Sequence, residues 1–187
     1  IKLLVAVGRL EQQKDYFNLI KAFQYIREND DNIRLWIVGE GSQRNVLEKI
    51  IKEKKLEDHV KLLGMQEDIV GILSAADLFV LSSAYEGFGL VVAEAMLTEK
   101  IVVATDCGGV SEVVGEFGFL CPPQDPILLS KSINAALNLT EDERKKLATN
   151  AREHVISNFS LEMITKQWLE IYENLIRDKN FYRNKKN

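Results

Sequence analysis

Short apolar runs alternate with longer amphipathic stretches along the first 120 residues, and this alternation constrains the fold more than any other feature. The runs are rich in β-branched residues and predict strands, whereas the stretches between them carry apolar residues at helical spacing, such as Leu19, Ile20 and Phe23. Each connection has the right length for a right-handed crossover, which indicates a parallel sheet. We expect strands at residues 2–7, 33–38, 60–63, 77–82, 101–104 and 118–120.

The predicted class is α/β, with a Rossmann-like, doubly wound parallel sheet of about six strands. Asp15 and Ser42 are predicted N-caps of the helices after the first two strands. After residue 125 the strands stop, and three further helices are expected at about 126–138, 141–157 and 161–178. Ligands of such sheets bind at the carboxyl ends of the strands, so the loops after the strands are the places to look for chemistry.

The last predicted helix carries an apolar seam too rich to face water. Its members recur every three or four residues: Leu161, Ile164, Trp168, Ile171 and Leu175. The seam packs either on the domain's own sheet or on a neighbouring domain outside this chain, and the sequence favours neither. We predict one domain over 1–178 and a basic, disordered tail over 179–187.

Charge limits the partners of the chain. The last eleven of the 187 residues hold five basic groups and one acid, so the other 176 carry 19 basic and 27 acidic groups, a net charge of −8. A body this acidic lacks the cationic face that nucleic acid requires. The basic tail is expected to give only weak, salt-sensitive contact with anionic lipid.

The cellular setting is expected to be reducing and cytoplasmic. Cys107 and Cys121 form neither a disulfide framework nor a metal-ligand spacing, and no secretory signal precedes them. The longest apolar run, 3–7, is far shorter than the roughly 20 residues of a membrane span. The chain opens on a strand without Met, as though it were part of a longer polypeptide.

A first group of candidate residues follows the first strand. Gly8 at the strand end lets the backbone approach a ligand, while Arg9 and Lys14 can reach over the sheet edge as two cations. This outlines an anion site, although loop Arg and Lys side chains are more often simply solvated.

A second group follows the fourth strand. Gly87 and Gly89 clear side chains from a turn, and a helix starting near Gly89 presents free N–H groups that suit a phosphate. Glu94 lies about 7 Å along that helix, flanked by apolar residues, and needs a donor such as a sugar hydroxyl. Glu86 lies in the turn itself, nearer the opening of the predicted site. We favour a ligand site over an internal cap or salt bridge of Glu94.

A third turn, Gly108-Gly109, follows the fifth strand and precedes Ser111 and Glu112. Two interpretations are equally good: a ligand turn of the same kind, or a plain tight turn with Ser111 as N-cap.

Taken together, these motifs resemble the carboxyl-terminal, nucleotide-sugar-binding half of retaining GT-B glycosyltransferases. The resemblance is to the group 1, or family-four, type that includes bacterial capsule and lipopolysaccharide transferases. The motifs occur in the same order: Gly8-Arg9-Leu10 with Lys14, Val38-Gly39-Glu40-Gly41, Ser74-Ala75-Ala76-Asp77, Glu86 and Glu94 with seven residues between them, and Gly108-Gly109 with Glu112.

The resemblance implies a role for each candidate. Arg9 and Lys14 would hold the diphosphate of the donor, and the backbone at Leu90 would add N–H donors. Glu94 would bind ribose hydroxyls, and Glu86 would contact the transferred sugar. The base would lie against the loop around Leu63 to Met65. The other donor-binding residues would be Gly8, Gly39, Gly87, Phe88 and Gly89.

The resemblance also implies the chemistry. The chain has no Asp-x-Asp motif, so no metal cofactor is expected, and the two cations and the helix dipole would neutralise the leaving diphosphate. The leaving phosphate would accept the acceptor's proton, with Glu86 as nucleophile the less favoured alternative. A UDP-sugar is favoured over a GDP-sugar. The amino-terminal, acceptor-binding domain would be a partner, and this chain alone would bind donor and transfer nothing.

Two departures from the family pattern and two alternative functions remain. Asp15 stands where glycine is common and Ser82 where proline is common, and neither is expected to touch the chemistry. The chain could be an inert nucleotide-sugar-binding module. An NAD(P)-binding domain is disfavoured, because Arg44 stands where the fingerprint that begins at Gly39 and Gly41 needs its third glycine.

Overall fold

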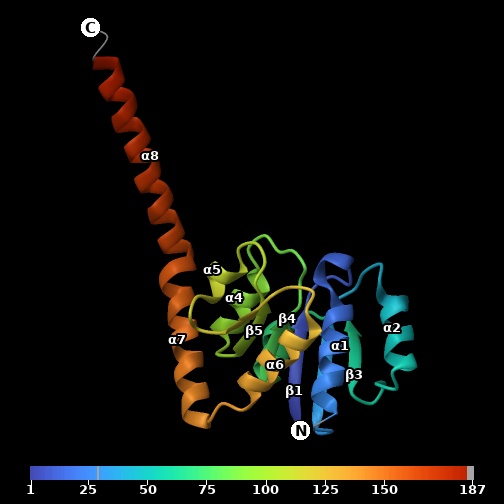
Figure 1. Ribbon diagram of the computed structural model, residues 1–187. Helices are drawn as coiled ribbons and strands as arrows, with labels where there is room; N and C mark the ends of the chain where they lie inside the picture. The colour runs from blue at the N-terminus through green and yellow to red at the C-terminus, as the bar shows by residue number, and fades with distance from the viewer. Residues whose placement is uncertain (29, 185–187) are drawn as a thin grey trace.

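Six parallel strands form the single sheet of this domain, in the order β3-β2-β1-β4-β5-β6 (Figure 1). The computed structural model describes residues 1–28 and 30–184, with side chains through residue 177. The sheet confirms the predicted α/β class and the predicted number of strands. The strands are β1 Lys2–Val7, β2 Ile33–Val38, β3 Val60–Gly64, β4 Leu78–Leu81, β5 Ile101–Thr105 and β6 Phe119–Cys121.

Helices cover both faces of the sheet. Strand residues alternate between the faces: Leu4 of β1 packs in one core with α1, α2 and α6, whereas Val5 packs in the other with α3, α4, α5 and part of α7. The helices are η1 Gln12–Lys14 (3₁₀), α1 Tyr16–Arg27, α2 Arg44–Glu53, α3 Ile69–Ala75, α4 Leu90–Leu97, α5 Val110–Val114, α6 Pro126–Leu137, α7 Glu141–Phe159 and α8 Leu161–Asn184.

The strand order reverses between β1 and β4, where the chain begins to build the sheet in the opposite direction. The loops after these two strands diverge to opposite faces, which leaves a crevice at the carboxyl edge. The first two predicted groups of candidate residues follow β1 and β4 and therefore meet at this point.

The predicted cap at Asp15 is confirmed, whereas the one at Ser42 is wrong. Asp15 caps α1, as expected, through its carboxylate and the amide of Asn18. The N-cap of α2 is Gln43, because both the amide and the hydroxyl of Ser42 bind the Glu11 carboxylate instead. The N-cap of α5 is Gly109, so the interpretation of Ser111 as a cap is also incorrect.

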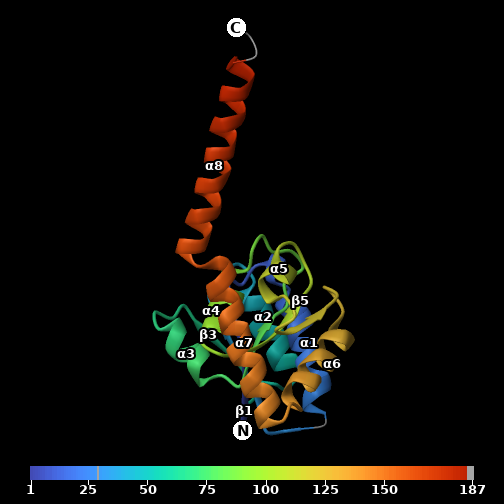
Figure 2. The ribbon, with the colours of Figure 1, turned by 90° about the vertical axis from the view of Figure 1, so that its left-hand side faces the viewer.

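Helix α8 leaves the body of the domain (Figures 1 and 2). Its contacts are with α7, and Leu161, Trp168 and Leu175 of the predicted seam are exposed. The seam therefore does not pack on the domain's own sheet. Residues 179–184 of the expected tail fall within α8, although their side chains lie outside the described part of the chain. Residues 185–187 of that tail lie outside it entirely. Within the described ranges, no helix is both long enough and apolar enough to cross a membrane.

Candidate active site

A pocket of about 470 Å³ opens at the carboxyl edge between β1 and β4, and it holds most of the predicted ligand-binding residues. Four segments line it: the end of β1 with the loop that follows, the start of α3, the turn before α4, and the first half of α4. Its lining comprises Val7, Gly8, Arg9, Gln13, Lys14, Ile69, Glu86, Phe88, Gly89, Leu90, Val91 and Glu94.

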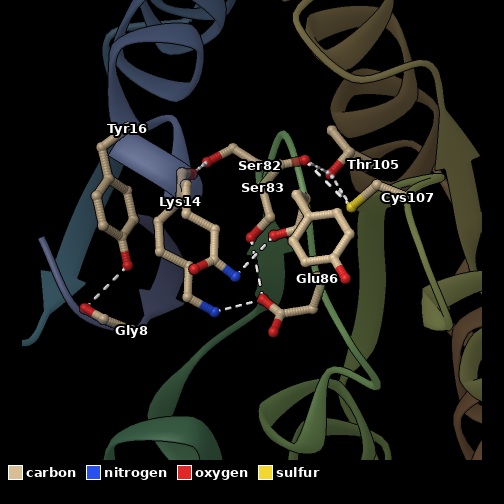
Figure 3. Close-up of polar contacts among 10 residues, drawn as sticks. Gly8, Lys14, Tyr16, Ser82, Ser83, Glu86, Thr105 and Cys107 are labelled. Atoms are coloured by element: carbon tan, nitrogen blue, oxygen red, sulfur yellow. Dashed lines mark hydrogen bonds and ion pairs between the residues drawn. The ribbon is translucent and has the colours of Figure 1, made fainter. Parts of the chain in front are cut away.

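Hydrogen bonds tie the two loops of the pocket together. The Ala84 amide donates to the Gln13 carbonyl at 2.8 Å, and the Gln13 side-chain amide donates to the Tyr85 carbonyl at 2.9 Å. The Ser82 hydroxyl donates to the Lys14 carbonyl at 2.8 Å (Figure 3). These bonds fix the β1 loop against the β4 loop, and Ser82, expected to be uninvolved, in fact contacts the backbone of a candidate residue.

Lys14 and Glu86 meet across the pocket (Figure 3). The Lys14 Nζ lies 2.5 Å from Glu86 Oε2, and both side chains are mostly buried, with relative exposures of 15% and 14%. The Ser83 hydroxyl donates to the same carboxylate oxygen at 3.3 Å. The ammonium of Lys14 is therefore paired with a carboxylate, a contact that the sequence-based roles did not include.

A buried polar cluster adjoins this pair through Ser83. The hydroxyl of Thr105 and the thiol of Cys107 both donate to the Ser83 carbonyl, at 2.6 and 3.3 Å. Burial raises the pKa of the Cys107 thiol. Burial, followed by the charge of Glu86, raises the pKa of Tyr16, whose hydroxyl donates to the Gly8 carbonyl at 3.1 Å.

The amino-terminus of α4 faces the same pocket. Gly89 is its N-cap, with φ of 82° and ψ of 51°, and no side chain caps the first turn. The first amides of this helix therefore stay available to an anion in the pocket, whose lining includes Leu90 and Val91. Arg9 lies on the opposite side with an exposed side chain. Two basic side chains and one helix amino-terminus thus converge.

The sequence as a whole matches the family described as "Glycosyl transferases group 1" over residues 2–154. The chain belongs to the group 1 glycosyl transferases. This result confirms the resemblance to GT-B glycosyltransferases, and it counts against the NAD(P)-binding alternative.

Several known proteins are similar to this chain in sequence or structure. N-acetyl-alpha-D-glucosaminyl L-malate synthase of Bacillus anthracis is 32% identical over 95% of the chain and 46% of its own length. A point mutant of S. aureus TarM, crystallised with fondaparinux, alpha-GlcNAc-glycerol and UDP, superposes with a TM-score of 0.85 at 29% identity, over 91% of this chain and 35% of TarM. Anabaena Alr3699/HepE in complex with UDP gives a TM-score of 0.82 at 29% identity, over 92% and 48%. The chain thus spans about half the length of the curated relatives it matches.

Most residues that the motifs of this glycosyltransferase domain had singled out do line the pocket. They are Gly8, Arg9, Lys14, Glu86, Phe88, Gly89, Leu90 and Glu94. Four others lie outside its lining: Gly39, Leu63, Met65 and Gly87.

The four outlying residues have other surroundings. A Cβ on Gly39 would clash with the Gly8 carbonyl oxygen, so this glycine lets two loops pack together. Leu63 is half-buried against the second core, Met65 is 80% exposed, and a Cβ on Gly87 would meet no atom within 4 Å.

The expectation that Glu94 is shielded from water is wrong. The apolar neighbours Val92, Ala93 and Ala95 point into the core, whereas Glu94 points out of it and is exposed. Among the described residues its carboxylate has no hydrogen-bond partner, which rules out an internal cap or salt bridge there. The flanking residues misled because helical neighbours in sequence lie on different faces.

Sequence reasoning missed four lining residues: Val7, Gln13, Ile69 and Val91. Gln13 had a signal, since it is a polar residue in the loop between Arg9 and Lys14. Ile69 had none, because it is an apolar residue at the start of α3, separate in sequence from each group of candidate residues. Among the described residues, no group of three or more His, Cys, Asp or Glu side chains has the arrangement of a metal site.

Proposed function

We propose that this chain is the donor-binding half of a retaining glycosyltransferase, which transfers a sugar from a nucleoside diphosphate sugar, a UDP-sugar by preference, to a glycan or lipid-linked acceptor. One observation carries the proposal: Arg9, Lys14 and the uncapped amino-terminus of α4 face one pocket at the point where the strand order reverses. The crystal structures of two neighbours with UDP support the choice of donor.

The diphosphate would lie between the two cations and the start of α4. Its negative charge grows as the bond to the sugar breaks, so donors fixed at this position stabilise the transition state more than the ground state. Glu94, exposed and lining the pocket farther along α4, would accept hydrogen bonds from ribose hydroxyls. The base would extend toward the β3 loop around Leu63 and Met65.

Glu86 would contact the transferred sugar. Its carboxylate is paired with Lys14 and bonded by Ser83, and both contacts lower its nucleophilicity. This favours front-side attack, in which the acceptor hydroxyl loses its proton to the leaving phosphate as the oxygen bonds to the anomeric carbon. Retention of configuration follows without a covalent intermediate on Glu86.

The acceptor would bind on an amino-terminal domain outside this chain, which spans about half the length of its curated relatives. The exposed seam of α8, with Trp168, Ile171 and Leu175, would lie against that domain. The 187-residue chain by itself would therefore bind donor without transferring sugar.

We expect the chain to bind UDP with equal affinity in EDTA and in magnesium. Two cations and the free amides of a helix terminus can offset the diphosphate charge without a divalent ion. Calorimetric titration with UDP, GDP, ADP and NAD checks both the metal dependence and the choice of nucleotide. Strict dependence on magnesium, or a preference for NAD, would overturn the proposal.

Substitutions of the two glutamates are expected to affect UDP binding differently. Glu94→Ala should weaken UDP binding by roughly 1 to 3 kcal/mol, because ribose hydroxyls lose a charged acceptor. Glu86→Gln should leave UDP binding as tight as in the parent or tighter, because Lys14 no longer has to leave a carboxylate to meet the phosphates. Glu116→Gln, an exposed acid outside the pocket, is the control. Equal weakening by both pocket substitutions would remove the support for two separate subsites.

A further inference from the structure

The backbone has an unusual conformation at Asp15, directly after the peptide that joins Lys14 to Asp15. Asp15 has φ of 46° and ψ of 50°, in the left-handed region that residues other than glycine disfavour. It ends η1 and caps α1 at the same time. The orientation of this peptide sets the direction in which the Lys14 side chain leaves the backbone. A contact that fixes the peptide therefore also fixes the side chain.

Ser82 supplies that restraint. Its hydroxyl donates to the Lys14 carbonyl at 2.8 Å, and its side chain is only 2% exposed, directly after the buried strand β4. The hydroxyl is buried and the bond is partly buried, so removing the hydroxyl would leave the Lys14 carbonyl without its donor. The bond from the Ala84 amide to the Gln13 carbonyl lies beside it and fixes the preceding peptide.

We propose that Ser82 is a positioning residue for Lys14. It holds the Lys14 carbonyl toward β4, which directs the Lys14 side chain toward Glu86 (Figure 3). The same direction would bring the ammonium to a diphosphate bound in the pocket. This inference rests on the proposed function. Asp15 and Ser82, the two departures from the family pattern, thus meet at one peptide group, where the hydroxyl stabilises a conformation that a glycine would adopt unaided.

A double-mutant cycle on UDP binding tests the inference. Ser82→Ala should weaken binding of UDP by the 187-residue chain roughly three- to tenfold, about what the net loss of one hydrogen bond is worth. In a Lys14→Met background the same substitution should change affinity less than twofold, because the side chain through which Ser82 acts is gone. Ser82→Thr, which keeps the hydroxyl, should restore most of the affinity.

The control is Ser130→Ala. Ser130 is also a buried serine, 6% exposed, whose hydroxyl donates to a backbone carbonyl, that of Ile127 at 2.8 Å, but it lies in α6 outside the pocket. It should leave UDP affinity unchanged. If Ser82→Ala loses the parent's melting transition, Ser82→Cys takes its place in the cycle, since it keeps the volume and replaces the hydroxyl by a weak donor.

The outcomes separate the inference from the proposed function. Unchanged affinity in Ser82→Ala, or equal weakening with and without Lys14, overturns the positioning role while the proposed function stands. Parent-like binding by Lys14→Met, or no binding of UDP by the parent chain, overturns the proposed function and this inference with it.

Discussion

Replacing Lys14 by alanine in an active enzyme that contains this domain should lower kcat about 100-fold, the usual cost of removing one donor that stabilises a developing negative charge. The KM for the donor sugar should change much less, because Lys14 is paired with Glu86 and contributes most to the diphosphate after the bond to the sugar has broken, as in free UDP. Steady-state kinetics with a saturating acceptor measures both quantities. Arg9→Ala is expected to behave in the same way.

The matched control is Lys61→Ala, an exposed lysine on β3 outside the pocket, which should leave both constants unchanged. If Lys14→Ala raised KM and left kcat intact, Lys14 would bind donor and transition state equally. Its assignment to the leaving group would then be wrong.

Gly108→Ala should destabilise the domain by roughly 2 to 4 kcal/mol, since two unfavourable effects combine at this residue. Its φ is 57°, and an added Cβ would clash with the Glu86 carbonyl oxygen. The Glu86 turn would have to move away from β5 to relieve the clash, so UDP-sugar binding should also weaken. Thermal unfolding followed by circular dichroism measures the loss of stability.

Gly87→Ala is the control, because Gly87 lies in the same turn as Glu86 and directly follows it in sequence. An added Cβ there would meet no atom within 4 Å, and the residue has no positive φ. Its stability should stay within about 0.5 kcal/mol of the parent. Comparable destabilisation by both substitutions would mean that the turn is sensitive to any side chain, and the close approach of Gly108 to Glu86 would lose its significance.

The fold was largely predictable because the strands of a doubly wound sheet are buried on both faces. All four residues of β4 and all five of β5 are buried, and such runs are visible in a sequence without an alignment. The position of α8, directed away from the sheet (Figure 1), was not predictable. Its seam of Trp168, Ile171 and Leu175 has the spacing of a packed helix, but spacing does not say what it packs against.

The candidate site was predictable at the level of its loops and less so at the level of contacts. Arg9, Lys14, Glu86 and Glu94 follow strands whose carboxyl ends meet, so topology alone brings them together. The ion pair between Lys14 and Glu86 depends on side-chain directions that no periodicity encodes. The Ser82 bond to the Lys14 backbone was equally hidden, because it joins residues separated by 68 positions in sequence.

The position of the pocket at the junction of β1 and β4 has a consequence for folding. One side of the pocket comes from the half of the sheet that contains β1, β2 and β3, and the other from the half that contains β4, β5 and β6. Under the proposed function, nucleotide would bind tightly only after both halves have assembled, so the appearance of nucleotide binding in a refolding experiment would report their docking rather than the formation of either half. A bound nucleotide at a hundred times its dissociation constant adds about 2.7 kcal/mol to the native state, and this linkage acts on the junction itself.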